Sequence, residues 1–271
     1  SKNIKSEDNF KNKYSNDELE VRFGINYKNP ITRNNFENTI RKIQSSGWNQ
    51  MNREEKDFLK IQTEYYNQST GKKQMNNIRV EVSSMNTIQK YCKTNSLPSK
   101  ELKARRIKFL KKKTKFVDDS KLFPIDYYNF EFRVNYKQED QMTVKAGPVK
   151  SILEDWNTSR KTFRLLKRYS YIHPSFPFRI DCSIVKSSTK KSGYLIPTWN
   201  IHESNVFNNN ETYEIEIEFL NLKARLIPAN ELFQNIRQNI KLILSGLQET
   251  NFPISFSEID LTRKQYLSLL Y

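Results

Sequence analysis

The sequence predicts a mainly β chain of the α+β class, folded as a closed antiparallel barrel. Segments that alternate apolar and charged residues recur along the chain, for example YEIEIEF at 213–219. Alternation with a period of two is typical of strands that bury one face. Segments with helical periodicity lie mostly near the two ends of the chain, which disfavours a βαβ sheet. About eight strands are predicted, and that number is enough to close a barrel.

The first half of the chain mixes strands and helices. Phe36, Ile40 and Ile43 have helical spacing, and Gly47 follows them as a stop signal. Residues 52–66 fit either a helix or a strand. In order, the other predicted elements are a strand at 17–24, a helix at 33–47, a strand at 77–84, a helix at 86–94, and a helix from Ser99 into the basic run KFLKKKTKF.

The second half is predicted to be mostly strands. Gly147-Pro148 is expected to form a turn, and a loop with two prolines separates two of the strands. After Pro228, the apolar residues between Leu232 and Leu247 recur at helical spacing. The predicted elements are strands at 130–139, 142–146, 160–171, 178–188 and 213–219, followed by an amphipathic helix at 229–247.

The charge balance points to a polyanionic partner. The formal net charge is +16, from 46 Lys and Arg against 30 Asp and Glu. Nucleic acid is the first candidate partner, and an anionic membrane surface is the second. Two histidines and two widely separated cysteines, Cys92 and Cys182, are a poor inventory for a zinc site or a Ser-His triad. A metal in this chain would therefore be held by oxygen ligands.

Strand after strand pairs an apolar face with a face of charged residues of both signs. Two arrangements explain this pattern. In one, the apolar faces form a core and the charges face water; in the other, the charges point into a wide barrel and helices cover its apolar outside. Along the chain, the charged faces carry Glu18, Glu20 and Arg22; Arg79 and Glu81; Arg133, Asn135, Lys137 and Glu139; Arg164 and Arg168; Arg179, Asp181 and Ser183; and Glu214, Glu216 and Glu218.

The second arrangement would create a specific kind of site. Two carboxylates ~4 Å apart repel by about 4 kcal/mol at an effective dielectric of ~20, so converging glutamates need a neutralising cation. Because His and Cys ligands are scarce, that cation would be a hard one, Mg²⁺ or Mn²⁺. Guanidinium and ammonium groups on the opposite wall would suit phosphate oxygens. Together they describe a site for a triphosphate.

Several motifs resemble those of the triphosphate tunnel metalloenzymes. ELEVRFG near the start and YEIEIEF near the end resemble the two glutamate motifs of this family. Between them, Arg164, Arg168 and Ser170 resemble its basic strand, and RIDCSIVKSS resembles its Asp-x-Thr/Ser strand. A single ExE occurs in many sheets by chance, but the ordered set over about residues 17–247 is specific. In particular, the chain resembles the RNA triphosphatases of fungi and large DNA viruses, which begin mRNA capping.

The resemblance implies an eight-stranded barrel that encloses a tunnel and hydrolyses the γ-phosphate of 5′-triphosphate RNA. It implies Mg²⁺ or Mn²⁺ contacted by Glu18, Glu20 and Glu218. Glu214 and Glu216 would hold metal-bound or attacking water. Water would attack in line, without a covalent intermediate on the protein.

The remaining implied roles concern the phosphate groups and the walls that hold them. Asp181 and Ser183 would orient the basic wall, and Glu139 resembles an additional water-positioning acid. The side chains implied to bind phosphate are Arg22, Arg79, Arg164, Arg168, Arg179 and Ser183, with Lys111, Lys113, Arg133 and Lys137 as further phosphate or RNA contacts.

One position departs from the family's pattern. A lysine usually lies between the two arginines of the basic strand, and here that position is Leu166; Lys167 is adjacent and is expected to point outward. Either a neighbouring strand supplies the missing charge, or the tunnel is less active than its motifs indicate. Two alternatives therefore stay open: an inorganic triphosphatase or polyphosphate-handling tunnel that also accepts free nucleoside triphosphates, and a degenerate tunnel that binds RNA without chemistry.

We expect three segments along the chain. These are a flexible arm at 1–16, the tunnel domain at 17–250 and a linker at 251–271 toward further domains of a longer chain. The resemblance to viral capping enzymes implies that those domains are a guanylyltransferase and a methyltransferase; no K-x-D-G motif of a nucleotidyl-transfer lysine occurs here. Without a signal peptide or a long apolar run, we expect a protein that is cytoplasmic, or in the virion or viral factory if viral, and not secreted or membrane-bound.

Overall fold

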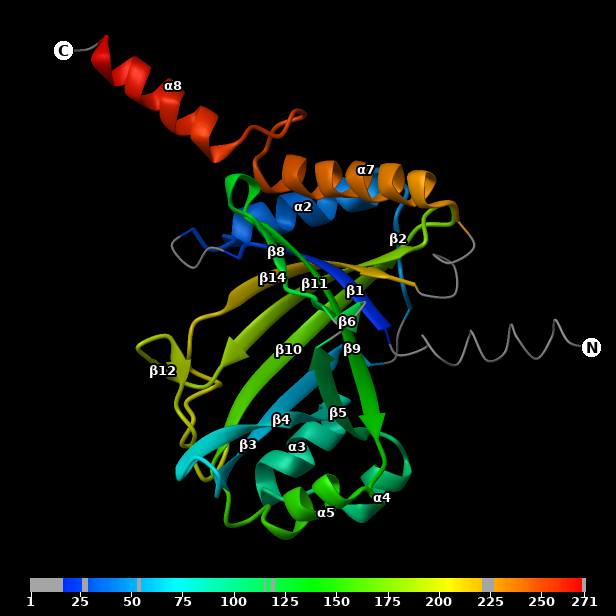
Figure 1. Cartoon of the computed structure of the whole chain (residues 1–271), viewed down its shortest axis with the longest axis vertical. Helices are drawn as coiled ribbons and strands as arrows, with labels where there is room; N and C mark the ends of the chain where they lie inside the picture. Colours follow the sequence, from blue (N-terminus) through cyan, green and yellow to red (C-terminus); the bar gives the residue numbers. More distant parts are fainter. Residues whose placement is uncertain are drawn as a thin grey trace, which may run out of the picture.

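Eight antiparallel strands close into a barrel (Figure 1). The computed structural model describes residues 17–25, 29–52, 55–114, 116–117, 120–220 and 227–269. The first strand, Asp17–Phe23, also pairs with the last strand of the ring, Phe132–Met142, so that Phe23 lies opposite Phe132 and Asp17 opposite Gln138. This pairing closes the barrel. The strand order is β1 (Asp17–Phe23), β14 (Thr212–Phe219), β11 (Phe178–Ser187), β10 (Lys161–Ile172), β3 (Asp57–Asn67), β4 (Lys72–Ser83), β5 (Ile107–Thr114) and β9 (Phe132–Met142).

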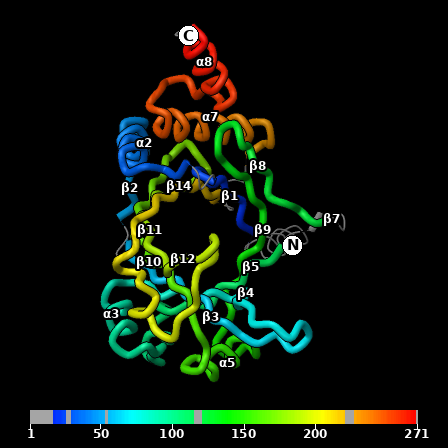
Figure 2. Tube along the Cα trace, turned by 90° about the vertical axis from the view of Figure 1, so that its left-hand side faces the viewer, coloured from blue at the N-terminus to red at the C-terminus, as the bar shows by residue number. Residues whose placement is uncertain are grey.

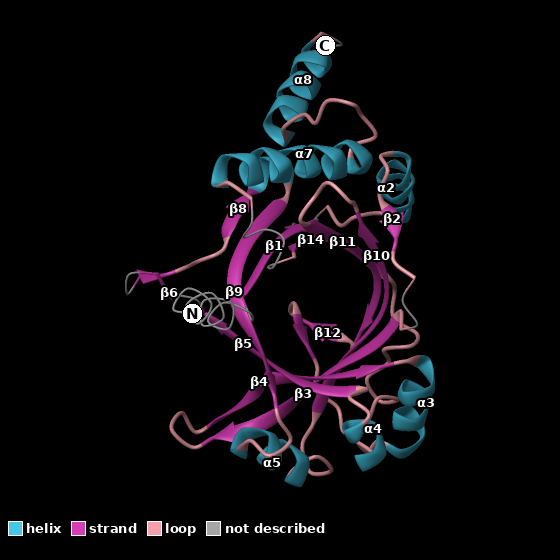
Figure 3. Ribbon diagram, turned by 90° about the vertical axis from the view of Figure 1, so that its right-hand side faces the viewer, coloured by secondary structure: helices cyan, strands magenta, loops and turns pink. Residues whose placement is uncertain are grey.

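Helices and short strands surround this barrel. Figures 2 and 3 view the ring from its two ends, with helices on its outside only. The helices are α2 (Arg33–Ser45), α3 (Met85–Thr94), α4 (Ser99–Lys103), α5 (Gly147–Glu154), α7 (Ala229–Leu247) and α8 (Phe256–Ser268), with a 3-10 turn η1 (Tyr128–Phe130). The short strands are β2 (Asn49–Gln50), β6 (Phe116–Val117), β7 (Ser120–Lys121), β8 (Ile125–Tyr127), β12 (Lys190–Lys191) and β13 (Tyr194–Leu195).

The apolar core lies outside the barrel, between its strands and the helices. One cluster packs β1, β11 and β14 against α2 and α7, through residues such as Val21, Ile217 and Ile43. A second packs β3, β4 and β5 against α3 and α5, through residues such as Leu59 and Ile88. Because successive side chains of a strand point to opposite faces, the charged residues of these strands face the interior. The structure therefore adopts the second of the two arrangements that the sequence left open.

Most of the predicted elements are confirmed. The predicted helix after Pro228 is α7, with the expected bounds, and most of the ambiguous segment 52–66 belongs to the strand β3, which ends one residue later. The predicted strands at 17–24, 77–84, 160–171, 178–188 and 213–219 lie within one to five residues of β1, β4, β10, β11 and β14.

Three predictions about local structure are wrong. The helix that begins at Ser99 ends at Lys103, and the basic run forms β5, where Ile107 and Phe109 are buried between the barrel and the helices. Residues 142–146 form no separate strand, because β9 already extends to Met142. Gly147-Pro148 begins the helix α5 instead of a turn, and proline is favoured in the first helical turn, where its missing N–H is not needed.

Of the two ends of the chain, the structure describes only the C-terminal one in part. The predicted arm at 1–16 lies outside the described residues. In the predicted linker, residues 256–268 form α8, whose start is stabilised by a capping box between Ser255 and Glu258. A linker role for this segment stays a prediction. Among the helices that the structure describes, none combines the length and apolar character that crossing a bilayer requires.

The close packing of α7 on α2 leads to a stability prediction. Gly246 of α7 lies against Thr39 of α2, and a Cβ atom at position 246 would lie 2.7 Å from the Thr39 Cα. We expect Gly246→Ala to lower the free energy of unfolding by about 1–3 kcal/mol, because this backbone contact leaves no room for a methyl group. Chemical denaturation measures it. Gly147→Ala is the matched control, since a Cβ there meets no atom within 4 Å. Equal stability of both variants would contradict the prediction.

Candidate active site

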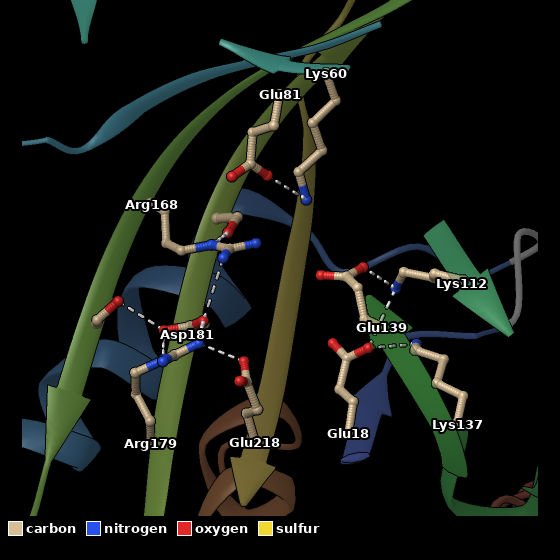
Figure 4. A network of polar contacts seen from close by, with 12 residues as sticks. Glu18, Lys60, Glu81, Lys112, Lys137, Glu139, Arg168, Arg179, Asp181 and Glu218 are labelled. Atoms are coloured by element: carbon tan, nitrogen blue, oxygen red, sulfur yellow. Dashed lines mark hydrogen bonds and ion pairs between the residues drawn. The ribbon is translucent and has the colours of Figure 1, made fainter. Parts of the chain in front are cut away.

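The barrel interior holds a dense set of acidic and basic side chains from all eight strands. Figure 4 shows many of them pointing toward one another across the interior. The interior carboxylates include those of Glu18, Glu20, Glu81, Glu139, Asp181, Glu214, Glu216 and Glu218. Each of these has a Lys or Arg nitrogen within 4.0 Å.

The predicted metal-contacting glutamates lie on the neighbouring strands β1 and β14, where Glu20 is directly opposite Glu218. The Glu20 carboxylate accepts hydrogen bonds from Lys137 and from the Asn135 amide, the latter at 3.1 Å. The Glu18 Oε2 is buried and lies 3.5 Å from the Lys137 Nζ, yet no described residue donates a hydrogen bond to it. The strand pairing thus brings the backbone segments of these three glutamates together, while their carboxylates turn toward cationic side chains.

Asp181 organises the opposite, basic wall. Its carboxylate is 1% exposed and accepts a hydrogen bond from the Ser170 hydroxyl at 2.6 Å. Arg179 donates two further bonds to it, at 2.9 and 3.0 Å, and also donates to Glu218. Arg168 lies 3.5 Å from Asp181 and 3.4 Å from the Ser183 hydroxyl. This bonding holds two guanidinium groups in place, and the orienting role of Asp181 and Ser183 stays a prediction.

The other predicted interior residues form two more groups. Arg22 of β1 and Arg164 of β10 both donate to the Glu214 carboxylate. Arg79 of β4 donates to Glu139 of β9 at 3.1 Å, across the intervening strand β5. The interior therefore joins residues that are up to about two hundred positions apart in the sequence.

Two predicted contacts, Lys111 and Lys113, lie away from this interior set, and a third, Arg133, lies opposite Arg22 but is bound to a short neighbouring strand. Lys111 and Lys113 of β5 share a face with Phe109, which packs on the outer helices, and the Lys113 ammonium lies 2.5 Å from Asp140. Arg133 of β9 donates two bonds to Asp126 of the short strand β8, at 2.5 and 2.9 Å. In a run of three lysines, strand alternation allows only the central one, Lys112, to share the interior face.

Two interior lysines had no role in the sequence-based hypothesis. Lys112 lies 3.6 Å from both Glu18 and Glu139. Lys60 of β3 lies 4.0 Å from Glu81 and is directly opposite Arg164 in the sheet. Lys60 was missed because its segment fitted either a helix or a strand, although Leu59 and Ile61 alternate with it.

Lys60 lies close to Leu166, the uncharged position of the basic strand β10. Leu166, the next interior residue after Arg164, is 2% exposed and lies opposite Phe58 of β3. Lys60 lies two residues further along the same strand. A neighbouring strand thus supplies a cationic side chain close to the position that Leu166 leaves uncharged.

The interior field shifts several pKa values. Burial alone would raise the pKa of Glu216, but Arg22, Arg168, Lys60 and Lys112 outweigh it and hold the pKa at about 2. Burial, with the nearby Asp181 and Glu18 carboxylates, raises the pKa of Glu218 to about 7 despite Arg179. Shifts of this kind are concentrated at functional sites, although structural ion pairs also cause them.

A cavity of about 300 Å³ lies within the barrel. Its lining contains the cationic residues Lys60, Arg79, Lys112 and Arg164 and, among the described residues, no carboxylate. Lys112 and Arg164 connect it to the acidic groups, since they also contact Glu18 and Glu214. The rest of the lining is Gln62, Asn77, Leu110, Thr162 and Leu195. A pocket with this lining suits an anion with several charges.

The donor chemistry on β1 and β14 fits a hard divalent cation. Carboxylate oxygens are the ligands that Mg²⁺ and Mn²⁺ prefer, and the buried Glu18 Oε2 accepts no hydrogen bond from the described residues. Within the described part of the chain, no three acidic, His or Cys side chains converge closely enough to ligate one ion as they stand. Metal binding would therefore require these carboxylates to turn from Lys137 and Arg179 toward a shared position.

Fold and interior define a closed antiparallel barrel with a buried network of paired charges. No family model matches the chain, and no curated protein matches it. Among solved structures, one similar chain is the Pct1 RNA triphosphatase of S. pombe, in complex with the Spt5 CTD. The likeness covers 93% of this chain and 95% of that one, at 12% sequence identity and a TM-score of 0.42. Likeness at this level carries no argument about activity.

The buried position of Lys60 leads to a prediction about its protonation. Burial, with the nearby Arg79 and Arg168 guanidinium groups, lowers the pKa of Lys60 to about 7. Folded Lys60 should therefore lose its proton near pH 7, whereas the unfolded chain keeps it up to about pH 10.4, so this lysine makes stability rise with pH between those values.

Carbon-13 NMR of labelled lysine side chains measures this pKa directly. The Lys60 Cε resonance should titrate with a midpoint near pH 7, and Lys60→Met identifies it by its disappearance. The exposed Lys264 on α8 serves as the internal reference. A Lys60 midpoint in the usual range of lysine, about 10.4, would show that its charge is not suppressed.

Proposed function

We propose that the chain is a divalent-metal-dependent polynucleotide 5′-triphosphatase that removes the γ-phosphate of 5′-triphosphate RNA, the first step of mRNA capping. The supporting observation is the cationic cavity beside the acidic wall of β1 and β14. An oxygen-rich anion and a hard cation are the two kinds of ligand that these walls suit. In a triphosphate–metal complex the two occur together.

The cationic side chains would bind and orient the phosphates. Lys60, Arg79, Lys112 and Arg164 line the cavity and would contact the triphosphate chain there. Arg168 and Arg179, held by Asp181, would present donors at fixed positions to the oxygens on which charge builds up in the transition state. Because Asp181 and Ser170 already order these guanidinium groups, little reorganisation would accompany the reaction.

The acidic wall would supply the cation and position water. Glu18, Glu20 and Glu218 would hold Mg²⁺ or Mn²⁺, which when bound polarises the phosphate oxygens. Glu216, whose pKa is about 2, stays ionised at neutral pH and would accept a hydrogen bond from the attacking water. Glu214 would share this task, and Glu139, next to Arg79 and Lys112, would orient water from the other wall.

A second candidate is an inorganic triphosphatase that also accepts free nucleoside triphosphates. One observation favours it: among the described residues that line the cavity, none is aromatic and could stack on a base. Phosphate release from triphosphate-ended RNA, from nucleoside triphosphate and from tripolyphosphate separates the candidates through their kcat/KM values. Binding of RNA without phosphate release from any of the three would instead support a degenerate tunnel that carries Leu166 in place of a lysine.

Removal of one interior carboxylate tests the catalytic proposal. We expect Glu20→Gln and Glu216→Gln to lower kcat/KM for triphosphate-ended RNA by at least about 100-fold, the usual effect of losing one preorganised charge contact. Phosphate release with Mg²⁺ or Mn²⁺ is the measurement, and circular dichroism verifies folding. Glu37→Gln, on the outer face of α2, is the matched control. Wild-type turnover in either interior variant would remove the assignment of the acidic wall.

Direct metal binding tests the ligand set without catalysis. Isothermal titration of Mn²⁺ should give stoichiometric binding to the wild-type protein. Glu18→Gln should weaken it at least about tenfold, the size of loss seen when metal sites lose a supporting group. Glu37→Gln should bind Mn²⁺ as the wild type does. If the wild-type protein takes up no Mn²⁺, even with tripolyphosphate present, the metal assignment is wrong.

A further inference from the structure

The hairpin of β12 and β13 lies across one mouth of the barrel. Figure 1 places it beyond one end of the strands, and Figures 2 and 3 place it inside the outline of the ring. Leu195 of β13 lines the interior cavity together with Lys60 and Arg164. The hairpin therefore reaches from the cationic cavity to the outside of the molecule.

The base of this hairpin is firmly attached to the barrel. The Ser188 N–H donates to the Phe163 carbonyl at 2.8 Å, and Lys161 and Thr198 exchange two backbone hydrogen bonds of 2.7 and 2.9 Å. The turn consists of Ser192 and Gly193, both with positive φ, at 50° and 83°. Such two-residue turns match the natural twist of paired strands. The hairpin is thus a defined projection that places its tip at the mouth.

The tip presents an aromatic ring and two ammonium groups to solvent. Tyr194 is 81% exposed, so its ring is available for stacking. Lys190 and Lys191 of β12 are exposed as well. These three side chains belong neither to the apolar core clusters nor to the interior ion pairs.

We propose that this hairpin binds the 5′-terminal nucleotides of RNA. Tyr194 stacks on a base next to the triphosphate. Lys191, directly opposite Tyr194 in the hairpin, contacts the adjoining phosphodiester group, and Lys190, opposite Leu195 on the other face, contacts a neighbouring one. An exposed aromatic side chain beside cationic ones is the combination that single-stranded nucleic acid requires, because every base has a stacking face and every linkage a negative charge.

This inference rests on the proposed function and deepens it. The cavity binds charge without an aromatic side chain in its lining, so it offers the same contacts to RNA and to inorganic triphosphate. RNA and tripolyphosphate would therefore be distinguished by residues at the mouth, which a nucleotide contacts and tripolyphosphate does not. The hairpin tip is such a place, since Leu195 lines the cavity and the adjacent Tyr194 faces solvent.

Binding measurements without divalent metal test the inference separately from turnover. Fluorescence anisotropy with a labelled 5′-triphosphate oligoribonucleotide gives Kd, and competition by tripolyphosphate gives its affinity for the cavity. Tyr194→Ala should raise the Kd for RNA about tenfold, the usual effect of losing one base–aromatic contact, while Tyr194→Trp keeps it near the wild-type value. The affinity for tripolyphosphate should stay within about twofold in both variants, because the cavity is unchanged.

The lysines are tested through the salt dependence. Lys190→Gln with Lys191→Gln should weaken RNA binding and reduce the slope of log Kd against log salt by about 1.4, as expected for two lost phosphate contacts to a single strand. Tyr266→Ala and Lys264→Gln on α8 are the matched controls; Tyr266 is 62% exposed. Both controls should bind RNA with wild-type affinity and salt slope.

The outcomes separate the hairpin from the proposed activity. If Tyr194→Ala binds RNA as tightly as the wild type, the hairpin inference is overturned, even where the protein releases phosphate from RNA. If Tyr194→Ala weakens RNA binding but the wild type releases no phosphate with Mg²⁺ or Mn²⁺, the hairpin inference holds and the triphosphatase proposal fails. An equal loss of tripolyphosphate affinity in Tyr194→Ala would also overturn the inference, since it would indicate a disturbed cavity.

Discussion

Charges that are buried inside a barrel must be neutralised, and this constraint governs the architecture of the molecule. An isolated carboxylate or ammonium group loses several kcal/mol of hydration on burial, so it persists only beside a partner of opposite sign. The interior pairs, such as Arg179 with Asp181 and Arg79 with Glu139, meet this requirement. With the charged faces inside, the apolar faces point outward and need a cover. The helices α2 and α7 on one side, and α3 and α5 on the other, provide it.

The pairing also makes the interior responsive to ligands. Lys112 and Arg164 line the cavity but are bound to Glu18 and Glu214. In the proposed activity, phosphate oxygens would bind these cationic groups in place of the carboxylates. The carboxylates would then lack their cationic partners. A divalent cation on the acidic wall would then restore the balance. Anion and metal should therefore favour each other's binding, since each one compensates the charge that the other exposes.

In the proposed function, the chemistry and the choice of substrate belong to different parts of the fold. The strands hold the reacting groups on a closed sheet, where Asp181 keeps two guanidinium groups in place. The hairpin of β12 and β13 is a local excursion between two barrel strands, and its tip can vary without disturbing the sheet. Such a division would allow the substrate preference to change while the interior stays the same.

The sequence by itself determined the barrel, most of its strands and the faces that carry charge, because period-two alternation is a local property that needs no partner. It also placed Glu20, Glu216 and Asp181 on the charged faces of their strands, and the resemblance of their motifs suggested the triphosphate chemistry. Whether those faces point inward was decided only by the tertiary structure, since alternation looks the same in a normal and an inverted barrel. Long-range pairing likewise turned the basic run after Lys103 into β5 and selected Lys112 over Lys113. Lys60 and the hairpin at the mouth emerged only from the folded chain, because their places beside the cavity depend on contacts with the distant strand β10.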